Sequence, residues 1–220
     1  MKDLVIVGVG GFAREVHQLL EDFGPQNSSY NFIGFLDDNR EHHGREVHGF
    51  PVLGDVAWLK EHGGVAVAIG IGGTVVKRRI VKRIQSSCAN SFATLIHPSA
   101  RIGNRVAIGE GTIICAGSIA TTDISIGKHV ILNLDCTVGH DAHIGAYVTV
   151  APSVNISGAV VVGAGCDLGT GSTIIQGINI GHWSVVGAGA VVVKDVPPNV
   201  TAVGMPAKPI KERAEGWHEE

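Results

Sequence analysis

Four of the eleven histidines lie between residues 100 and 200, and one of them stands beside a carboxylate. His140 directly precedes Asp141 within the segment Val138-Gly139-His140-Asp141. Histidine accepts a proton readily near neutral pH, and a carboxylate that contacts the imidazole can orient it and stabilise the imidazolium. Because consecutive residues of a strand point in opposite directions, the two side chains can meet only where the chain turns a corner. The pair is a candidate general base that would remove a proton from an amine or a hydroxyl.

A glycine-rich segment near the start of the chain has the spacing of a phosphate-binding turn. Residues 8–13 read Gly-Val-Gly-Gly-Phe-Ala, which satisfies G-x-G-x-x-A between an apolar run and an amphipathic one. This arrangement presents backbone amides to a phosphate at the start of a helix. The motif equally fits a dinucleotide with Asp37 or Asp38 on a ribose, although these acids lie farther along than the usual distance of about 20 residues.

The first ninety residues alternate between strand and helix patterns. Amphipathic stretches predict helices from Phe12 to Phe23 and from Thr74 to Gln85. Residues 49–55 are expected to form a loop, and a short helix is expected to end near His62. The alternation is typical of an α/β domain with a Rossmann-like parallel sheet and helices on its faces. We expect its strands at four apolar runs: 4–8, 32–38, 65–70 and 92–96.

A strict six-residue period begins at Ile96 and continues to Val192. Every sixth position is aliphatic, and of these seventeen residues all but Ala120 are Ile, Leu or Val. This period suits neither an α-helix nor a hairpin, but it suits a solenoid in which each hexad forms a short strand and a corner. Glycine after the aliphatic residue would supply backbone angles that other residues reach with strain. Small residues four places after it would fill the interior: Thr112, Ser118, Cys136, Cys166, Ser172, Ser184 and Ala190.

The hexads resemble those of the hexapeptide-repeat acyltransferases. Within that superfamily the chain resembles the branch of sialic acid O-acetyltransferases and bacterial N-acetyltransferases of nucleotide-linked amino sugars. Its matching segments are GVGGFAREV, FLDD, AIG, LNLDCTVGHDAHIG and VGMPAKPIK. The resemblance implies a left-handed parallel β-helix with three hexads per coil, and a homotrimer that binds acetyl-CoA between neighbouring β-helices. We accordingly divide the chain into an α/β nucleotide-sugar-binding domain (1–94), the β-helix (95–200) and a C-terminal tail (201–220).

The same resemblance implies roles for individual residues. His140 occupies the position of the catalytic base, Asp141 the acidic position after it, and Asn133 a polar position of the motif. Positions that would contact acetyl-CoA correspond to Thr149, where some relatives carry histidine, to Gly158, and to Ala188, where some carry glycine. The nucleotide-linked sugar would be held by Gly10, Gly11, Phe12, Asp37, Asp38 and Gly70.

The charge and the length of the apolar runs indicate which partners and which cellular location to expect. The net charge of −3 and the lack of long basic runs disfavour nucleic acid and anionic membranes as partners. No apolar run approaches the roughly 20 residues of a membrane span, so we expect a cytoplasmic protein.

We interpret the cysteines as buried thiols: Cys88, Cys115, Cys136 and Cys166. We interpret the cations of the second predicted helix as a solvated face: Lys77, Arg78, Arg79, Lys82 and Arg83.

These features together predict an acetyl-CoA-dependent N-acetyltransferase that acts on a nucleotide-linked amino-deoxy sugar, with no metal. O-acetylation of sialic acid or a related sugar is the alternative for the same base. A zinc site like that of the γ-type carbonic anhydrases is a second alternative, although His140 and His143 do not match the H-x-x-x-x-H pair of that family. A dinucleotide-dependent oxidoreductase or nucleotide sensor is a third, and it rests on the glycine turn alone.

Overall fold

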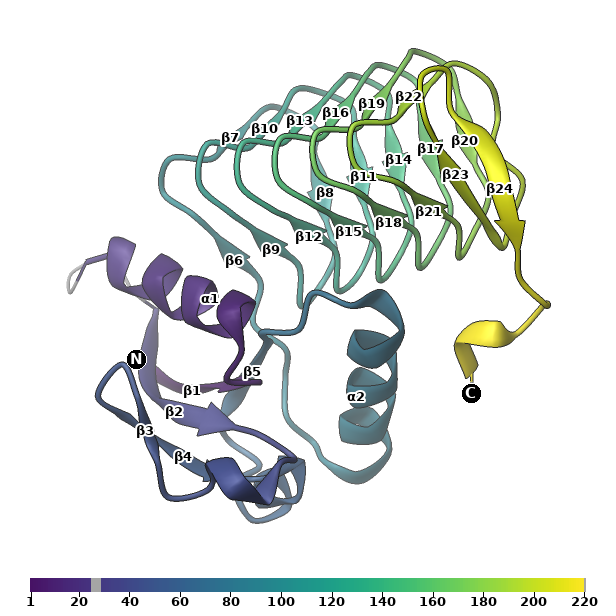
Figure 1. Ribbon diagram of the computed structural model, residues 1–220. Helices are drawn as coiled ribbons and strands as arrows, with labels where there is room; N and C mark the ends of the chain where they lie inside the picture. Colours follow the sequence, from purple (N-terminus) through teal and green to yellow (C-terminus); the bar gives the residue numbers. More distant parts are fainter. Residues whose placement is uncertain (25–28, 220) are drawn as a thin grey trace. The chain divides into compact units, whose positions relative to one another are not determined.

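The computed structural model describes residues 1–24 and 29–219, which form two compact units (Figure 1). The first unit comprises Met1–Gly72 and Val76–Pro98, and the second comprises Gly73–Val75 and Ser99–Glu220. No helix in the described part of the chain is both long and apolar enough to cross a membrane.

The first unit contains a five-stranded sheet with the order β3-β4-β2-β1-β5. Strand β1 pairs in parallel with both β2 and β5, and β2 pairs in parallel with β4. These parallel pairs confirm the Rossmann-like sheet. Residues 49–55, which we expected to form a loop, instead contain the strand β4, and β4 forms an antiparallel hairpin with β3. The strands are β1 (Lys2–Val7), β2 (Tyr30–Leu36), β3 (Glu46–Val47), β4 (Phe50–Gly54) and β5 (Ala66–Ile69). The helices are α1 (Gly11–Asp22) and α2 (Thr74–Ser87), with the 3₁₀ turns η1 (Arg40–His42) and η2 (Val56–Glu61).

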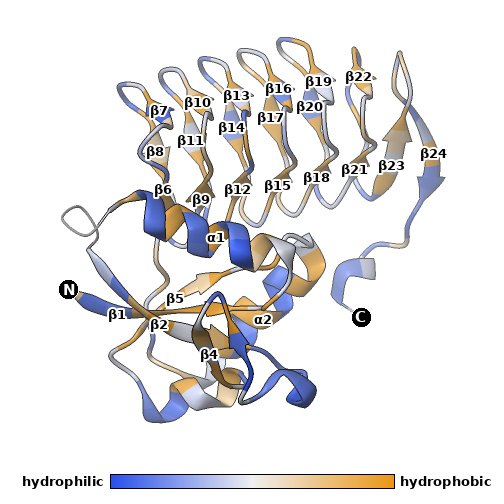
Figure 2. Cartoon of the chain, turned by 60° about the vertical axis from the view of Figure 1, so that its left-hand side comes forward, coloured by the Kyte–Doolittle hydropathy of each residue, from blue (hydrophilic) through white to orange (hydrophobic). Residues whose placement is uncertain are grey.

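Close packing of α1 on the sheet depends on two glycines at the ends of β1 and β5. Figure 2 shows that α1 is amphipathic, and Ala13, Val16, Leu19 and Leu20 on it are buried. A Cβ atom at Gly70 would lie 2.7 Å from the Cα atom of Ala13 in the first turn of α1. Gly8 has a φ of +105°, which an L side chain rarely adopts. Both glycines therefore let α1 begin directly at the carboxyl edge of the sheet.

The second unit is the expected left-handed parallel β-helix, in which every coil contains three two-residue strands (Figures 1 and 2). Each strand ends at one of the periodic aliphatic residues and pairs in parallel with the strand eighteen residues away, as Ile119 does with Thr137. The first face contains β7 (Arg101–Ile102), β10 (Ile119–Ala120), β13 (Thr137–Val138), β16 (Asn155–Ile156), β19 (Thr173–Ile174) and β22 (Val191–Val192).

The two other faces are built in the same way. The second face contains β8 (Ala107–Ile108), β11 (Ser125–Ile126), β14 (His143–Ile144), β17 (Val161–Val162) and β20 (Asn179–Ile180). The third face contains β9 (Ile113–Ile114), β12 (Ile131–Leu132), β15 (Thr149–Val150), β18 (Asp167–Leu168) and β21 (Val185–Val186). The strand β6 (Leu95–Ile96) comes before the first coil in the sequence.

Glycine after the aliphatic residue has a different role from the one we expected. Gly139 does not have a positive φ, and a Cβ atom there would lie 2.6 Å from the backbone N of Gly158 in the next coil. Close approach of successive coils therefore requires this glycine. Positive φ occurs two places later, where Asp141 (φ 59°) and Tyr147 (φ 63°) adopt it without being glycine. The small residues expected inside the coils are all buried, which confirms that part of the pattern.

The end of the chain continues the third face. Strand β23 (Val200–Val203) pairs in parallel with β21, and β24 (Lys208–Glu212) pairs antiparallel with β23. The 3₁₀ turn η3 (Trp217–Glu219) contains His218, whose ring stacks on Trp183 at a centroid distance of 3.8 Å. Strands β23 and β24 therefore extend the third face, and His218 packs against Trp183 in the last coils.

The inward direction of the periodic aliphatic residues can be tested on β17. Val162 is 1% exposed and its neighbour Val161 is 41% exposed. Val162→Ala should lower the free energy of unfolding by about 2 kcal/mol, because it leaves a cavity in a closely packed interior. Val161→Ala makes the same chemical change on the outside and should cost less than about 0.5 kcal/mol. Chemical denaturation followed by circular dichroism measures both, and equal losses would contradict the inward direction of this column.

Candidate active site

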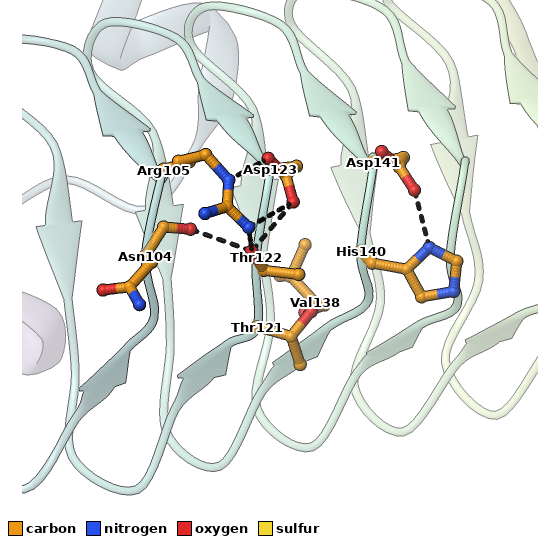
Figure 3. A network of polar contacts seen from close by, with 8 residues as sticks. All are labelled: Asn104, Arg105, Thr121, Thr122, Asp123, Val138, His140 and Asp141. Carbon is orange, nitrogen blue, oxygen red and sulfur yellow. Dashed lines mark hydrogen bonds and ion pairs between the residues drawn. The ribbon is translucent and has the colours of Figure 1, made fainter.

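His140 and Asp141 meet at the corner between β13 and β14, where the first face turns into the second (Figure 3). Asp141 has a φ of 59°, so the backbone turns and both side chains lie on the same side. The Nδ1 atom of His140 lies 2.8 Å from Oδ2 of Asp141. If Nδ1 carries the proton and donates it to this carboxylate, Nε2 has a free lone pair. The side chains are 55% and 65% exposed, so within one chain a substrate can reach this nitrogen.

Gly158 lies directly beneath the imidazole of His140, on the corresponding corner of the next coil. A Cβ atom at Gly158 would lie 2.6 Å from both Cε1 and Nε2 of His140. Glycine is therefore the residue that leaves room for the ring in this position. The N–H of Gly158 has no acceptor among the residues that the structure describes, so it can donate to a ligand held beside the imidazole.

Three other predicted site residues lie elsewhere on the β-helix. Asn133 follows β12 at the corner between the third and first faces, and its Oδ1 accepts a hydrogen bond from the N–H of Leu134 at 2.7 Å. Ala188 is exposed after β21 at the equivalent corner of a later coil. Thr149 is 8% exposed on β15 of the third face. Of the β-helix residues predicted for the site, a single chain thus brings together His140, Asp141 and Gly158.

The predicted nucleotide-binding residues meet at one edge of the sheet in the first unit. Gly10 and Gly11 follow β1 and begin α1, whereas Gly70 follows β5. Because β1 lies between β2 and β5 in a parallel arrangement, their carboxyl ends share this edge. Added Cβ atoms at Gly10 and Gly11 would meet nothing within 4 Å, so a ligand can approach this backbone closely. The side chain of Phe12 is half-buried next to them.

Both acidic residues after β2 already have partners. Nη2 of Arg83, on α2, lies 2.7 and 2.6 Å from the two carboxylate oxygens of Asp38. Oδ1 of Asp37 accepts the N–H of Asn39 at 2.8 Å and lies 3.2 Å from Nδ1 of His42. A ligand that bonds to Asp38 must therefore share this carboxylate with Arg83. A cavity of about 230 Å³ lies beside this pair, and its lining includes Asp55 and Lys60.

The interpretation of the α2 cations as a solvated face is wrong for Lys77, which is 1% exposed. Arg83 is exposed as expected, with 47% of its side chain accessible, but it also forms the ion pair with Asp38. Local sequence spacing gave no signal for this ion pair, because its two residues are 45 positions apart on different elements.

Three of the four cysteines are buried, as expected, and Cys88 is half-buried instead. Desolvation raises the pKa of the Cys136 thiol to about 11 and that of Cys166 to about 12. Both thiols therefore stay protonated at neutral pH and are poor nucleophiles. Among the residues described, no three His, Cys, Asp or Glu side chains are grouped so as to hold a metal ion.

Known proteins resemble the chain over both units. The family model for the PglD N-terminal domain matches residues 3–84. GDP-perosamine N-acetyltransferase of Escherichia coli O157:H7 is 31% identical over 163 residues, which cover 71% of each protein. UDP-N-acetylbacillosamine N-acetyltransferase of Bacillus subtilis (strain 168) is 36% identical over 118 residues, 53% of this chain and 52% of that protein. PerB from Caulobacter crescentus, solved in complex with CoA and GDP-perosamine, has a TM-score of 0.86 at 32% identity, covering 96% of this chain and 98% of that chain.

The contact between Gly158 and His140 predicts how an added methyl group would act. Gly158→Ala should displace the imidazole, because the new Cβ atom would occupy the place of its Cε1–Nε2 edge. The free energy of unfolding should change by less than about 1 kcal/mol, since the obstructing group is an exposed side chain that can move. Histidine ring signals in NMR spectra and chemical denaturation measure the two effects. Gly64→Ala is the control, because its methyl group would meet nothing within 4 Å; an unmoved His140 ring in Gly158→Ala would contradict the contact.

Proposed function

Because the chain belongs to the family of hexapeptide-repeat sugar acetyltransferases, we propose that it transfers the acetyl group of acetyl-CoA to the amine of a nucleotide-linked amino-deoxy sugar. The proposed role of this site rests on one observation. Nδ1 of His140 lies 2.8 Å from Oδ2 of Asp141, and the imidazole lies over Gly158. The names of relatives that act on GDP- and UDP-linked amino sugars support this substrate class.

In this mechanism His140 acts as the general base. Its Nε2 takes a proton from the sugar amine as the nitrogen attacks the carbonyl carbon of the thioester. Asp141 stabilises the resulting imidazolium through the bond to Nδ1. The N–H of Gly158 donates to the oxyanion of the tetrahedral intermediate. When the C–S bond breaks, the acetyl group stays on the sugar as an amide and the imidazolium returns its proton to the coenzyme A sulfur.

The α/β domain that we expect over residues 1–94 would hold the nucleotide. Gly10 and Gly11 are exposed with open space around them, so their N–H groups could donate to a diphosphate at the start of α1. Gly70 allows the close packing that places this turn, and Phe12, Asp37 and Asp38 would contact the rest of the ligand. We expect the reaction to take place in the cytoplasm, which cell fractionation would test.

Removal of the imidazole tests the base. His140→Ala should lower kcat by roughly 10² to 10⁴-fold, because the amine loses its proton acceptor. His143→Ala is the matched control, since His143 is an exposed histidine three residues away whose Nδ1 lies 2.6 Å from Oγ of Ser125. Release of the coenzyme A thiol, followed with GDP-, UDP- and dTDP-linked amino sugars as acceptors, provides the measurement.

Two outcomes of this assay would count against the proposal. Near-full turnover by His140→Ala would remove the base from the mechanism. Thiol release with sialic acid but with none of the amino sugars would replace N-acetylation by O-acetylation. Analysis of the product by mass spectrometry separates an amide from an ester.

We also propose that the working particle is a homotrimer whose acetyl-CoA site is shared between subunits. Thr149 and Ala188 lie away from the His140 corner within one chain, and a second copy would bring them near it. Exposed apolar side chains on the first face and at the corners support such contact: Ile119, Leu134, Ile175 and Val193.

Subunit sharing can be tested by mixing inactive variants. His140→Ala and Ala188→Trp should each be inactive, the second because the indole would fill the coenzyme cleft. Trimers refolded from an equal mixture should regain about a quarter of the wild-type activity, because one site in four combines both intact halves. No recovery in mixed trimers, or a fully active monomer in analytical ultracentrifugation, would contradict a shared site.

A further inference from the structure

An ion pair joins the two coils that precede the His140–Asp141 corner, at the equivalent positions (Figure 3). Arg105, Asp123 and Asp141 are eighteen residues apart and have nearly equal φ values of 58°, 57° and 59°. Nε of Arg105 donates to Oδ1 of Asp123, and Nη2 lies 3.2 Å from Oδ2. The guanidinium therefore binds this carboxylate through two parallel contacts, which fixes its direction as well as its distance.

The same network holds the backbone on which the catalytic pair lies. Nη2 of Arg105 donates to the hydroxyl of Thr122 at 3.1 Å. The carbonyl oxygen of Thr122 accepts the N–H of Asp141 at 3.2 Å, and the hydroxyl of Thr121 donates to the carbonyl of Val138 at 3.2 Å. The coil that carries Thr121 and Thr122 thus contacts the catalytic corner on both sides of His140.

The ion pair also sets the charge around the imidazole. Neighbouring coils are about 4.8 Å apart, so the carboxylates of Asp123 and Asp141 occupy adjacent places on one corner. The hydrogen bonds from Arg105 and Thr122 lower the pKa of Asp123, which keeps this carboxyl ionised. In Figure 3 the imidazole of His140 points away from this pair, toward the following coil.

The other groups around this corner supply little competing charge. The corner residues 157–159 and 175–177 of the next two coils carry no ionisable side chain. Lys194 and Asp195 follow only on the third coil, and His143 on the adjoining strand bonds to Ser125. Arg105 is therefore the cation that balances Asp123 at this corner.

We propose that Arg105 is a positioning residue for the catalytic pair. By binding Asp123 and Thr122, it fixes the coil on which Asp141 orients His140, and it keeps a second carboxylate from attracting the imidazole. This inference rests on the proposed role of His140 as the base.

Arg105→Gln should change both the rate and its pH dependence. The uncompensated Asp123 would stabilise the imidazolium, so the base would stay protonated to higher pH. The acid limb of the pH profile of kcat/KM should therefore move upward by about half a pH unit at low salt. This shift should shrink in 1 M salt, where the screening length falls to about 3 Å. Loss of the fixed corner should lower kcat on the order of tenfold, with little change in KM.

Two companion variants separate charge from geometry. Arg105→Gln combined with Asp123→Asn restores the charge balance, so the acid limb should return to its wild-type position while kcat stays low. Arg105→Lys keeps the charge but loses the two parallel contacts, so it should keep the wild-type acid limb with a partly reduced kcat. Because this variant retains the cation, it also serves if the glutamine variant fails to fold.

Lys128→Gln is the matched control. Nζ of Lys128 lies 3.7 Å from Glu110 on another corner of the β-helix, with 62% and 42% of the side chains exposed, compared with 68% and 40% in the Arg105–Asp123 pair. It should leave the pH profile unchanged. A wild-type pH profile and kcat in Arg105→Gln, or an equal shift in the single and double variants, would overturn the proposal. Failure of the proposed function would show itself separately, as inactivity of the wild-type protein or full activity of His140→Ala.

Discussion

The register of the coils is the constraint on which the rest of this structure depends. Parallel pairing at a separation of eighteen residues places equivalent corner residues directly above one another along the β-helix. Glycine after the inward aliphatic residue makes this spacing possible, because a Cβ atom at Gly139 would collide with the backbone of Gly158. The same stacking brings Gly158 under His140 and Asp123 beside Asp141. Packing inside the coil and chemistry outside it therefore follow from one repeat.

The six-residue period of the sequence was sufficient to predict the β-helix. The backbone conformation and the side-chain contacts at its corners were less predictable. The aliphatic column and the small interior residues lie where the sequence placed them, because burial selects residue types strongly and at fixed intervals. The position of positive φ was not predictable from glycine alone, since Asp141 and Tyr147 adopt it as well. The Arg105–Asp123 pair did have a signal, namely opposite charges eighteen residues apart, which becomes informative once three hexads per coil are assumed.

The first unit was harder to predict, because its contacts do not repeat. The parallel sheet follows from alternating strand and helix patterns, but the hairpin of β3 and β4 has only short strands, and Pro51 lies in the second of them. Asp38 and Arg83 are brought together only by the packing of α2 beside the end of β2. The sequence thus predicted which residues meet at this edge of the sheet, but it could not show that the carboxylate of Asp38 already pairs with Arg83.

The exposure of His140 is consistent with the proposal that a second subunit completes the site. Because more than half of the His140 side chain is in water, the solvent weakens its interactions with nearby charges. Its partner Asp141 is equally open to solvent, and the N–H of Gly158 could donate to water as readily as to an oxyanion. A surface that covers this corner would exclude water and strengthen all three interactions at once. The apolar side chains Ile119, Ile175 and Val193, exposed on the first face or beside this corner, are suited to pack against such a surface. In the proposed mechanism the chain would therefore supply a base, its orienting acid and an amide donor in fixed register, and assembly would supply the low-polarity surroundings in which they act.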